Sequence, residues 1–323
     1  MTAPAVQAPS WAGEAVDDLP PEHLVMGRAS NENFPVASRL LPARQRADLM
    51  ALYGWARLVD QLGDDYPGDR LSALDEVERQ LKAALRGDLA EAVHPLVAAI
   101  AGSVRRLGLP TEPLFDLVQA NRQDQHVSRY ANFDDLVGYC QLSANPVGRM
   151  VLAIFGVPTA ERVAWSDSIC TALQLVEHWQ DIAEDALAGR VYLPLSDMTR
   201  FGVEVGQLLP PRTGYVDRRR RGAPGGAAAN LRALVAFEAA RARTMLDDAG
   251  PQLVASLRGR LRFAVSGFVA GGHAALDRLA RQDFDPFADP ARPPRHRFAA
   301  HLARLLLATP PTALHATSKA AAP

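Results

Sequence analysis

Apolar residues recur at intervals of three and four along most of the chain, from about residue 21 to residue 285. This spacing places apolar side chains on one face of a helix, whereas a half-buried strand shows alternation at every second position. Alternating β-branched residues are nearly absent here. We therefore expect one all-α domain with helices near residues 43–64, 71–86, 91–107, 111–127, 132–155, 159–188, 228–249 and 252–281.

The two ends of the chain differ in composition from this helical region. Residues 1–20 are rich in alanine and proline, and we expect them to be disordered. The domain itself is expected to span residues 21–290, and residues 291–323 are expected to form an extended or disordered tail. Inside the domain, the arginine-rich run in residues 202–227 is interpreted as a solvated loop, with phosphate or lipid-headgroup contact as the alternative.

Composition and charge exclude several classes of protein. The formal net charge of the 323-residue chain is −1, so no global field attracts nucleic acid or an acidic membrane. The start of the chain lacks the basic and apolar regions of a signal peptide, and no apolar run approaches the roughly 20 residues of a membrane-spanning helix. Cys140 and Cys170 show no metal-ligand spacing and are expected to be reduced core thiols. We expect a cytoplasmic protein, with peripheral membrane contact left open.

Two acidic pairs interrupt the apolar pattern. Asp60 and Asp64 lie in "ALYGWARLVDQLGDD", and Asp181 and Asp185 lie in "LQLVEHWQDIAEDALAGRVYLP". Residues four apart lie one turn apart on the same helix face, so each pair brings two carboxylates together. Their neighbours are tryptophan, leucine and valine, which favour burial, and a buried polar stripe is costly unless something satisfies it.

The pairs have two interpretations. One is a solvated helix face. The other is a magnesium site, because Mg²⁺ takes one or two carboxylates and completes its shell with substrate phosphate oxygens. Arg46 and Arg57 flank the first pair at helical spacing, whereas Arg190 and Tyr192 follow the second. An arginine here can bond a diphosphate bidentately, but it can also be solvated or cap a helix end.

Taken together, these segments resemble the squalene/phytoene synthase family, the head-to-head prenyl transferases of the all-α isoprenoid synthase fold. The resemblance implies a single-domain helical bundle with a central active-site cavity. It covers roughly residues 25–285 and rests on "ENFPVASRLLPARQR" (32–46), "YGWARLVDQLGDD" (53–65), "NRQDQHVSRYANFDDLVGYCQLSANPVGRM" (121–150), "LQLVEHWQDIAED" (173–185) and "GRVYLP" (189–194).

Site roles follow from the resemblance, residue by residue. It implies two or three Mg²⁺ ions bound with the substrate diphosphate, and catalytic groups that include the metal ligands. The implied metal ligands are Asp60, Asp64, Asp181 and Asp185; the implied pocket residues are Tyr139 and Gln174; the implied substrate contacts are Asn33, Phe34, Arg46, Arg57, Asn145, Arg190 and Tyr192.

Within the family, "YCQLSANPVGR" and "HWQDIAEDALAGRVYLP" look most like the hydroxysqualene synthase branch of bacterial hopanoid biosynthesis, called HpnC. That branch is understood to ionise presqualene diphosphate, rearrange the cation and quench it with water, releasing hydroxysqualene and diphosphate without NADPH. Asn145 or Gln174 is the expected holder of the water. Two positions depart from the family pattern: Gln61 stands where an aspartate is common, and Glu177 where an asparagine is common.

Two alternatives stay open at this point. The first is condensation of two prenyl diphosphates to squalene, presqualene diphosphate or phytoene, and the second is a non-catalytic helical partner protein. The expected partner is an isoprenoid diphosphate, with functional coupling to other enzymes of squalene formation and no nucleic acid. Asp124 aligns with a polar position of the family pocket and is an open candidate for functional contact, whereas His126 and His178 are expected to be ordinary buried histidines.

Overall fold

The computed structural model describes residues 19–26, 43–88, 93–210, 226–288 and 295–307. Regular secondary structure in these ranges is helical, and their isolated β-bridge joins Arg129 to Val191. The all-α prediction is therefore confirmed for the described part of the chain. The helices are α1 (Glu22–Met26), α2 (Ala43–Asp64), α3 (Arg70–Arg86), α4 (Pro95–Leu107), α5 (Glu112–Asp124), α6 (Phe133–Ser143), α7 (Asn145–Ile154), α8 (Ala160–Leu187), α9 (Leu195–Phe201), η2 (Val205–Leu208), α10 (Gly226–Ser256), α11 (Gly259–Arg281) and α12 (Arg295–Leu307).

Short local signals mark many of the helix ends. Asp69 precedes α3 and accepts two backbone N–H groups of its first turn, and Asn132 and Thr159 do the same with one group each for α6 and α8. Such side chains satisfy backbone donors that have no partner inside the helix. Gly87 ends α3 with a φ of 91°, a conformation that a residue with a Cβ rarely adopts. These signals explain why several predicted boundaries agree closely with the structure.

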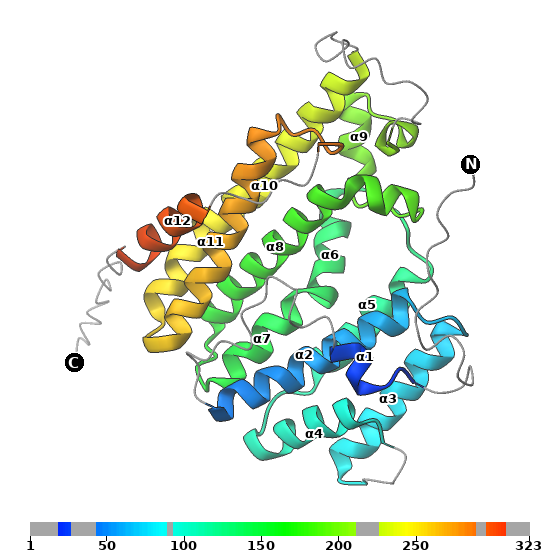
Figure 1. The fold of residues 1–323 in the computed structure, drawn as a ribbon, viewed down its shortest axis with the longest axis vertical. Helices are drawn as coiled ribbons and strands as arrows, with labels where there is room; N and C mark the ends of the chain where they lie inside the picture. Colours follow the sequence, from blue (N-terminus) through cyan, green and yellow to red (C-terminus); the bar gives the residue numbers. More distant parts are fainter. Residues whose placement is uncertain (1–18, 27–42, 89–92, 211–225, 289–294, 308–323) are drawn as a thin grey trace, which may run out of the picture.

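The helices form two packed groups on either side of the cavity described below. In Figure 1, α8 crosses the middle of the molecule, with α10 and α11 on one side and the group formed by α2, α3, α4 and α5 on the other. The buried apolar residues divide in the same way, into one cluster around α8, α10 and α11 and one around α2, α3 and α4. Val151 of α7 and Phe155, which directly follows this helix, contact both clusters, so α7 joins the two halves of the core.

The predicted helix 132–155 is in fact two helices. α6 ends at Ser143 and α7 begins at Asn145, with Pro146 in its first turn. Proline has no backbone N–H and disfavours helical geometry in the residue before it, so the ladder cannot run through this point. The prediction of one continuous helix was wrong, and the break brings Ser143 to the wall of the cavity.

The predicted break at residues 250–251 was also wrong. α10 continues through Pro251 to Ser256, and the chain turns just before Gly259, which has a φ of 58°. A Cβ on Gly250 would lie 2.7 Å from Cγ1 of Val269 on α11. Close packing of α10 on α11 therefore favours a continuous helix here, and this contact outweighs the hydrogen bond that Pro251 removes.

The tail differs from the expectation as well. Residues 295–307 form α12, which packs on α11 and α10, whereas an extended or disordered segment was expected there. Its pattern was missed because the predicted helical region stopped at residue 285. The domain limits at residues 20 and 290 stay predictions.

In the structure Cys140 and Cys170 are free thiols, and burial raises their pKa values to about 12 and about 11. Among the described helices, none combines the length and apolar character needed to cross a membrane.

Candidate active site

A cavity of about 530 Å³ lies between α2 and α8, with α5, α6 and α7 completing its walls. Its lining is strongly divided between charged and apolar side chains. The lining residues are Leu49, Leu52, Tyr53, Ala56, Arg57, Asp60, Asp64, Leu117, Asn121, Asp124, Tyr139, Ser143, Val147, Val151, Gln174, Glu177, His178, Asp181, Asp185, Arg190 and Tyr192.

Both acidic pairs line this one cavity. Asp60 and Asp64 come from the last turns of α2, and Asp181 and Asp185 come from the C-terminal part of α8. The two segments are far apart in the sequence, so only the packing of α2 opposite α8 brings the four carboxylates to one place. Like charges so arranged need cations.

Two arginines already neutralise the pair on α2. Nη1 of Arg57 lies 2.7 Å from Oδ2 of Asp60, and Nη2 of Arg190 lies 2.7 Å from Oδ1 of Asp64. Arg190 follows α8, so its ion pair ties the two acidic helices together across the mouth of the cavity. Burial opposes the charge on Arg190, but the Asp64 carboxylate outweighs this effect and raises the pKa of the guanidinium.

The pair on α8 has no arginine of this kind among the described ion pairs. Burial, together with the neighbouring carboxylates of Asp185 and Glu184, raises the pKa of Asp181 to about 6, against the opposing effect of Arg278. A carboxylate whose charge is disfavoured by its own surroundings is a good position for a cation that arrives with a substrate. Among the described residues, no group of three or more His, Cys, Asp or Glu side chains is arranged to hold a metal ion by itself.

Tyr139 and Asp124 form a hydrogen-bonded pair on the wall contributed by α5 and α6. The hydroxyl of Tyr139 donates to Oδ2 of Asp124 at 2.7 Å, whereas Oδ1 of Asp124 is buried and none of the described residues forms a hydrogen bond with it. Burial raises the pKa of Asp124 to about 6, and the hydrogen bond from Tyr139 and the charge of Arg190 oppose the rise. An unpaired buried carboxylate oxygen is costly, and such costs are concentrated at functional sites.

His178 is part of the site, although the sequence predicted an ordinary buried histidine. Its Nε2 lies 3.1 Å from Nε2 of Gln174, and its Nδ1 lies 3.8 Å from Oδ2 of Asp185. Its ring stacks on Tyr192 with centroids 3.7 Å apart. Burial lowers the pKa of His178, although Asp185 opposes this, so the ring is held neutral with Nε2 as acceptor from Gln174 and the Nδ1 proton directed at Asp185.

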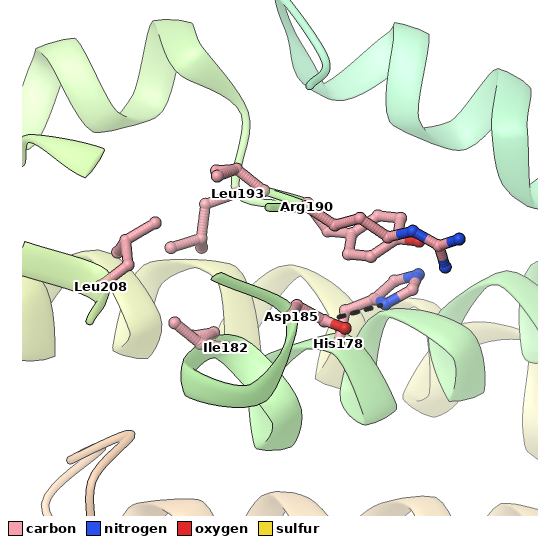
Figure 2. A pocket seen from close by; sticks show the side chains of 8 residues that line it. His178, Ile182, Asp185, Arg190, Leu193 and Leu208 are labelled. Carbon is pink, nitrogen blue, oxygen red and sulfur yellow. Dashed lines mark ion pairs between the residues drawn. The ribbon is translucent and has the colours of Figure 1, made fainter. Parts of the chain in front are cut away.

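Figure 2 shows this ring from a small neighbouring pocket, where a dashed line joins His178 to Asp185 and Arg190 extends beside them. The side chains of Ile182, Leu193 and Leu208 close the pocket on its other side, and its volume is only about 10 Å³. This apolar packing holds the loop after α8 against the helix. The position of Arg190 at the cavity mouth therefore depends on a well-packed support.

The opposite end of the cavity is apolar. Leu49 and Leu52 of α2 and Val147 and Val151 of α7 line it, together with Leu117 of α5. Such a lining has little to offer a charged group but can surround a hydrocarbon chain. The cavity as a whole is therefore suited to an amphipathic ligand with an anionic head and an apolar body.

Ser143 and Asn145, from the segment where α6 meets α7, are placed differently. Ser143 lines the cavity, and its buried Oγ has no hydrogen-bond partner in the part of the chain that the structure describes. Asn145 is buried outside the lining, and its Oδ1 accepts a hydrogen bond of 3.0 Å from Thr171 on α8. The structure thus brings Ser143 and Gln174 to the cavity, but not Asn145.

The remaining predicted residues are distributed as follows. Arg57, Tyr139, Gln174, Arg190 and Tyr192 line the cavity, whereas Arg46 on α2 does not. Asn33 and Phe34 lie outside the residues that the structure describes. The sequence interpretation did not assign a site role to Tyr53, Asn121 or Glu177, all of which line the cavity. Each of the three lies in a segment that carries the family resemblance. Tyr53 precedes Asp60 by seven residues and Glu177 precedes Asp181 by four, so helix geometry alone could have placed them on the same faces as these aspartates.

The sequence of the chain is similar to a known protein family and to several known proteins. The family model for squalene/phytoene synthase matches residues 28–299. A hydroxysqualene synthase from Sinorhizobium fredii is 34% identical over 260 residues, covering 78% of this chain and 80% of that protein. A phytoene synthase from Arthrospira platensis is 29% identical over 271 residues, covering 79% and 82%.

The fold is also similar to that of a solved structure. The crystal structure of squalene synthase HpnC from Alicyclobacillus acidocaldarius is similar with a TM-score of 0.69 and 36% sequence identity, covering 80% of this chain and 92% of that chain. The chain therefore has the all-α isoprenoid synthase fold, as the resemblance implied.

Proposed function

Because the chain belongs to the squalene/phytoene synthase family and is an enzyme of that family, we propose that it ionises presqualene diphosphate and captures the cation with water, giving hydroxysqualene and diphosphate. One observation carries the proposal: both acidic pairs line one cavity whose other end is apolar. Membership in an enzyme family argues against a non-catalytic helical partner. The relatives named hydroxysqualene synthase support water capture in particular.

The acidic end is proposed to bind the diphosphate together with Mg²⁺. The donor set fits such ions, because Asp60 and Asp64 face Asp181 and Asp185 across one cavity and hard oxygen ligands are those that Mg²⁺ prefers. Bound ions of this kind supply positive charge that stabilises the leaving diphosphate. The raised pKa of Asp181 supports the assignment, since that carboxylate gains from a nearby cation.

Arg57 and Arg190 are proposed to bind the diphosphate oxygens directly. Each guanidinium contacts one aspartate of α2, at 2.7 Å, and a guanidinium carries five N–H donors in all. An anion that enters between them adds charge-assisted hydrogen bonds, which are stronger than neutral ones. Arg190 remains charged at every relevant pH because Asp64 raises its pKa.

The carbocation that remains when the diphosphate leaves would lie next to aromatic side chains. Tyr139 and Tyr192 lie with ring centroids 5.8 Å apart, and both line the cavity beside His178. Aromatic faces attract cations, and a neutral imidazole does not repel them. Burial is the main cause that raises the pKa values of both tyrosines, so their hydroxyls stay protonated and offer no competing anionic nucleophile.

Water capture requires one ordered water near this cation. Ser143 Oγ has no hydrogen-bond partner among the described residues, so it is proposed to hold a water by donating or accepting a hydrogen bond. Gln174 uses its amide nitrogen toward His178, which leaves its carbonyl oxygen to accept from the same water. Leucine and valine side chains around the apolar end exclude other water molecules. Of the two expected holders of the water, Asn145 and Gln174, the proposal keeps Gln174 and sets Ser143 in place of Asn145.

The test supplies purified enzyme with presqualene diphosphate and Mg²⁺, with and without NADPH, and identifies the C30 product by mass spectrometry. Hydroxysqualene in both reactions is the expected result. Squalene formed only with NADPH would overturn water capture. Because the chain also resembles phytoene synthases, a parallel reaction contains farnesyl or geranylgeranyl diphosphate alone. Efficient condensation there, with no turnover of presqualene diphosphate, would favour the head-to-head synthase instead.

A further inference from the structure

The point where α11 begins and α12 ends exposes large apolar side chains. Phe263 on α11 is 44% exposed and Leu307 on α12 is 82% exposed. The two helix ends are in contact, because Nη2 of Arg262 donates to the carbonyl oxygen of Leu306 at 2.9 Å. Figure 1 shows them at one edge of the molecule, away from α2, α3 and α4. Exposed apolar residues that gather in one place often mark an interaction surface.

The same region is basic. Arg258, Arg260 and Arg304 are exposed. Arg260 precedes Phe263 by three residues and Arg304 precedes Leu307 by three, so each apolar side chain has an arginine beside it on the same helix face. Residues 249–276 and 295–307 contain no Asp or Glu, although the whole chain has a net charge of −1. The positive charge is therefore concentrated locally. We call this surface, made of Arg258, Arg260, Phe263, Arg304 and Leu307, the α11–α12 corner.

The corner lies at the end of the bundle where α8 begins. Arg162 in the first turn of α8 donates to the carbonyl oxygen of Ser256, at the end of α10, over 2.6 Å. From Arg162, α8 runs 19 residues to Asp181, which is about 28 Å at the usual rise of a helix. The acidic end of the cavity is thus remote from the corner. The apolar end is lined by Val147 and Val151 of α7, the helix that ends just before α8 begins, so this end lies toward the corner.

We propose that the α11–α12 corner docks this enzyme onto the surface of an anionic lipid bilayer. Arginines attract anionic headgroups, and phenylalanine and leucine beside them can enter the boundary between headgroups and acyl chains. Charge complementarity favours a membrane over a second copy of this chain, because two such corners would repel each other. Docking in this orientation directs the apolar end of the cavity toward the bilayer and the acidic end toward water.

The docking surface does not depend on the proposed reaction, so it is tested without substrate. The purified full chain is sedimented with vesicles of phosphatidylcholine alone and of phosphatidylcholine with phosphatidylglycerol, at low and high NaCl concentrations. Binding is expected only to the anionic vesicles and is expected to weaken with salt. Substituting Arg258→Gln, Arg260→Gln and Arg304→Gln together should weaken binding roughly a hundredfold, since each arginine near the surface contributes about fivefold.

A second variant, Phe263→Ser with Leu307→Ser, tests the apolar contribution and should weaken binding at least about tenfold. The matched controls are Leu187→Ser, a leucine that is 68% exposed at the far end of α8, and Arg281→Gln, an exposed arginine at the opposite end of α11. Both controls should bind as the wild type does. Circular dichroism checks that every variant is folded. Wild-type protein that ignores anionic vesicles, or controls that lose as much binding as the corner variants, would overturn the proposal.

Discussion

Replacing Asp124 by asparagine should stabilise the protein at neutral pH. Its carboxyl group has a pKa of about 6 in the folded protein, mainly because of burial, against 3.8 for a free aspartate. Between these two values the folded state holds a proton that the unfolded chain has lost. Raising the pH through this window therefore lowers the free energy of unfolding. Above about pH 6 this loss, which we call the deficit, stays nearly constant. Asparagine cannot ionise, so the variant avoids the deficit.

The magnitude follows from the two pKa values. Their difference is about 2 units, which corresponds to about 3 kcal/mol of lost stability at pH 7.5. The substitution also weakens the hydrogen bond that Tyr139 donates at 2.7 Å, which costs about 1 kcal/mol when a charged acceptor becomes neutral. We expect a net gain of about 2 kcal/mol at pH 7.5. At pH 5 the gain should be smaller by about 1 kcal/mol, since part of the deficit is then absent.

Urea unfolding of the wild type and Asp124→Asn at pH 5 and pH 7.5 measures this difference. The matched control is Asp134→Asn, which changes an exposed aspartate in the first turn of α6 and should show no such gain. An Asp124→Asn variant that is less stable than the wild type at pH 7.5, or that gains equally at both pH values, would refute the reasoning. Because side chains that reduce stability at a cavity are often kept for activity, turnover of the variant should fall while its stability rises.

Other predictions concern the metal, the water and the packing. Asp60→Ala or Asp181→Ala should lower turnover by at least about a hundredfold with circular dichroism unchanged; near wild-type activity at saturating Mg²⁺ would remove that residue from the ligand set. Ser143→Ala should reduce the share of hydroxysqualene among the products, whereas Ser166→Ala, a buried serine outside the cavity lining, should not. Gly272→Ala places a Cβ 2.7 Å from a leucine of α8 and 2.8 Å from one of α10, and should lower the free energy of unfolding by about 1–3 kcal/mol in denaturation curves.

Hydrophobic periodicity in the sequence was sufficient to predict the all-α fold class and the extents of several helices. The interval of three and four residues depends only on helix geometry, so α2, α3 and α8 were predictable from their sequence, with local caps such as Asp69 and Gly87 marking the ends of α3. The i, i+4 spacing of each acidic pair was equally local. The sequence therefore determined which carboxylates share a helix face, and Mg²⁺ binding by them stays a prediction from the family resemblance.

Tertiary packing decided what local pattern could not. Whether α10 stops at Pro251 depends on how closely Gly250 approaches Val269 of a neighbouring helix, and that contact is not encoded in the residues around the proline. Likewise, Ser143 and Asn145 are two residues apart in the chain, yet Ser143 faces the cavity and Asn145 bonds to Thr171. The direction of a side chain at a helix break depends on the helices packed around it.

The electrostatics of the site were decided in the same way. Asp124 is one acidic residue among many in the sequence, and its pKa rises because α5 and α6 bury it beside Tyr139. His178 belongs to the site because the loop after α8 folds back and stacks Tyr192 on its ring. Helix formation depends on neighbours in the chain, so the sequence alone predicted it; burial and charge depend on neighbours in space, and only the folded structure determined them.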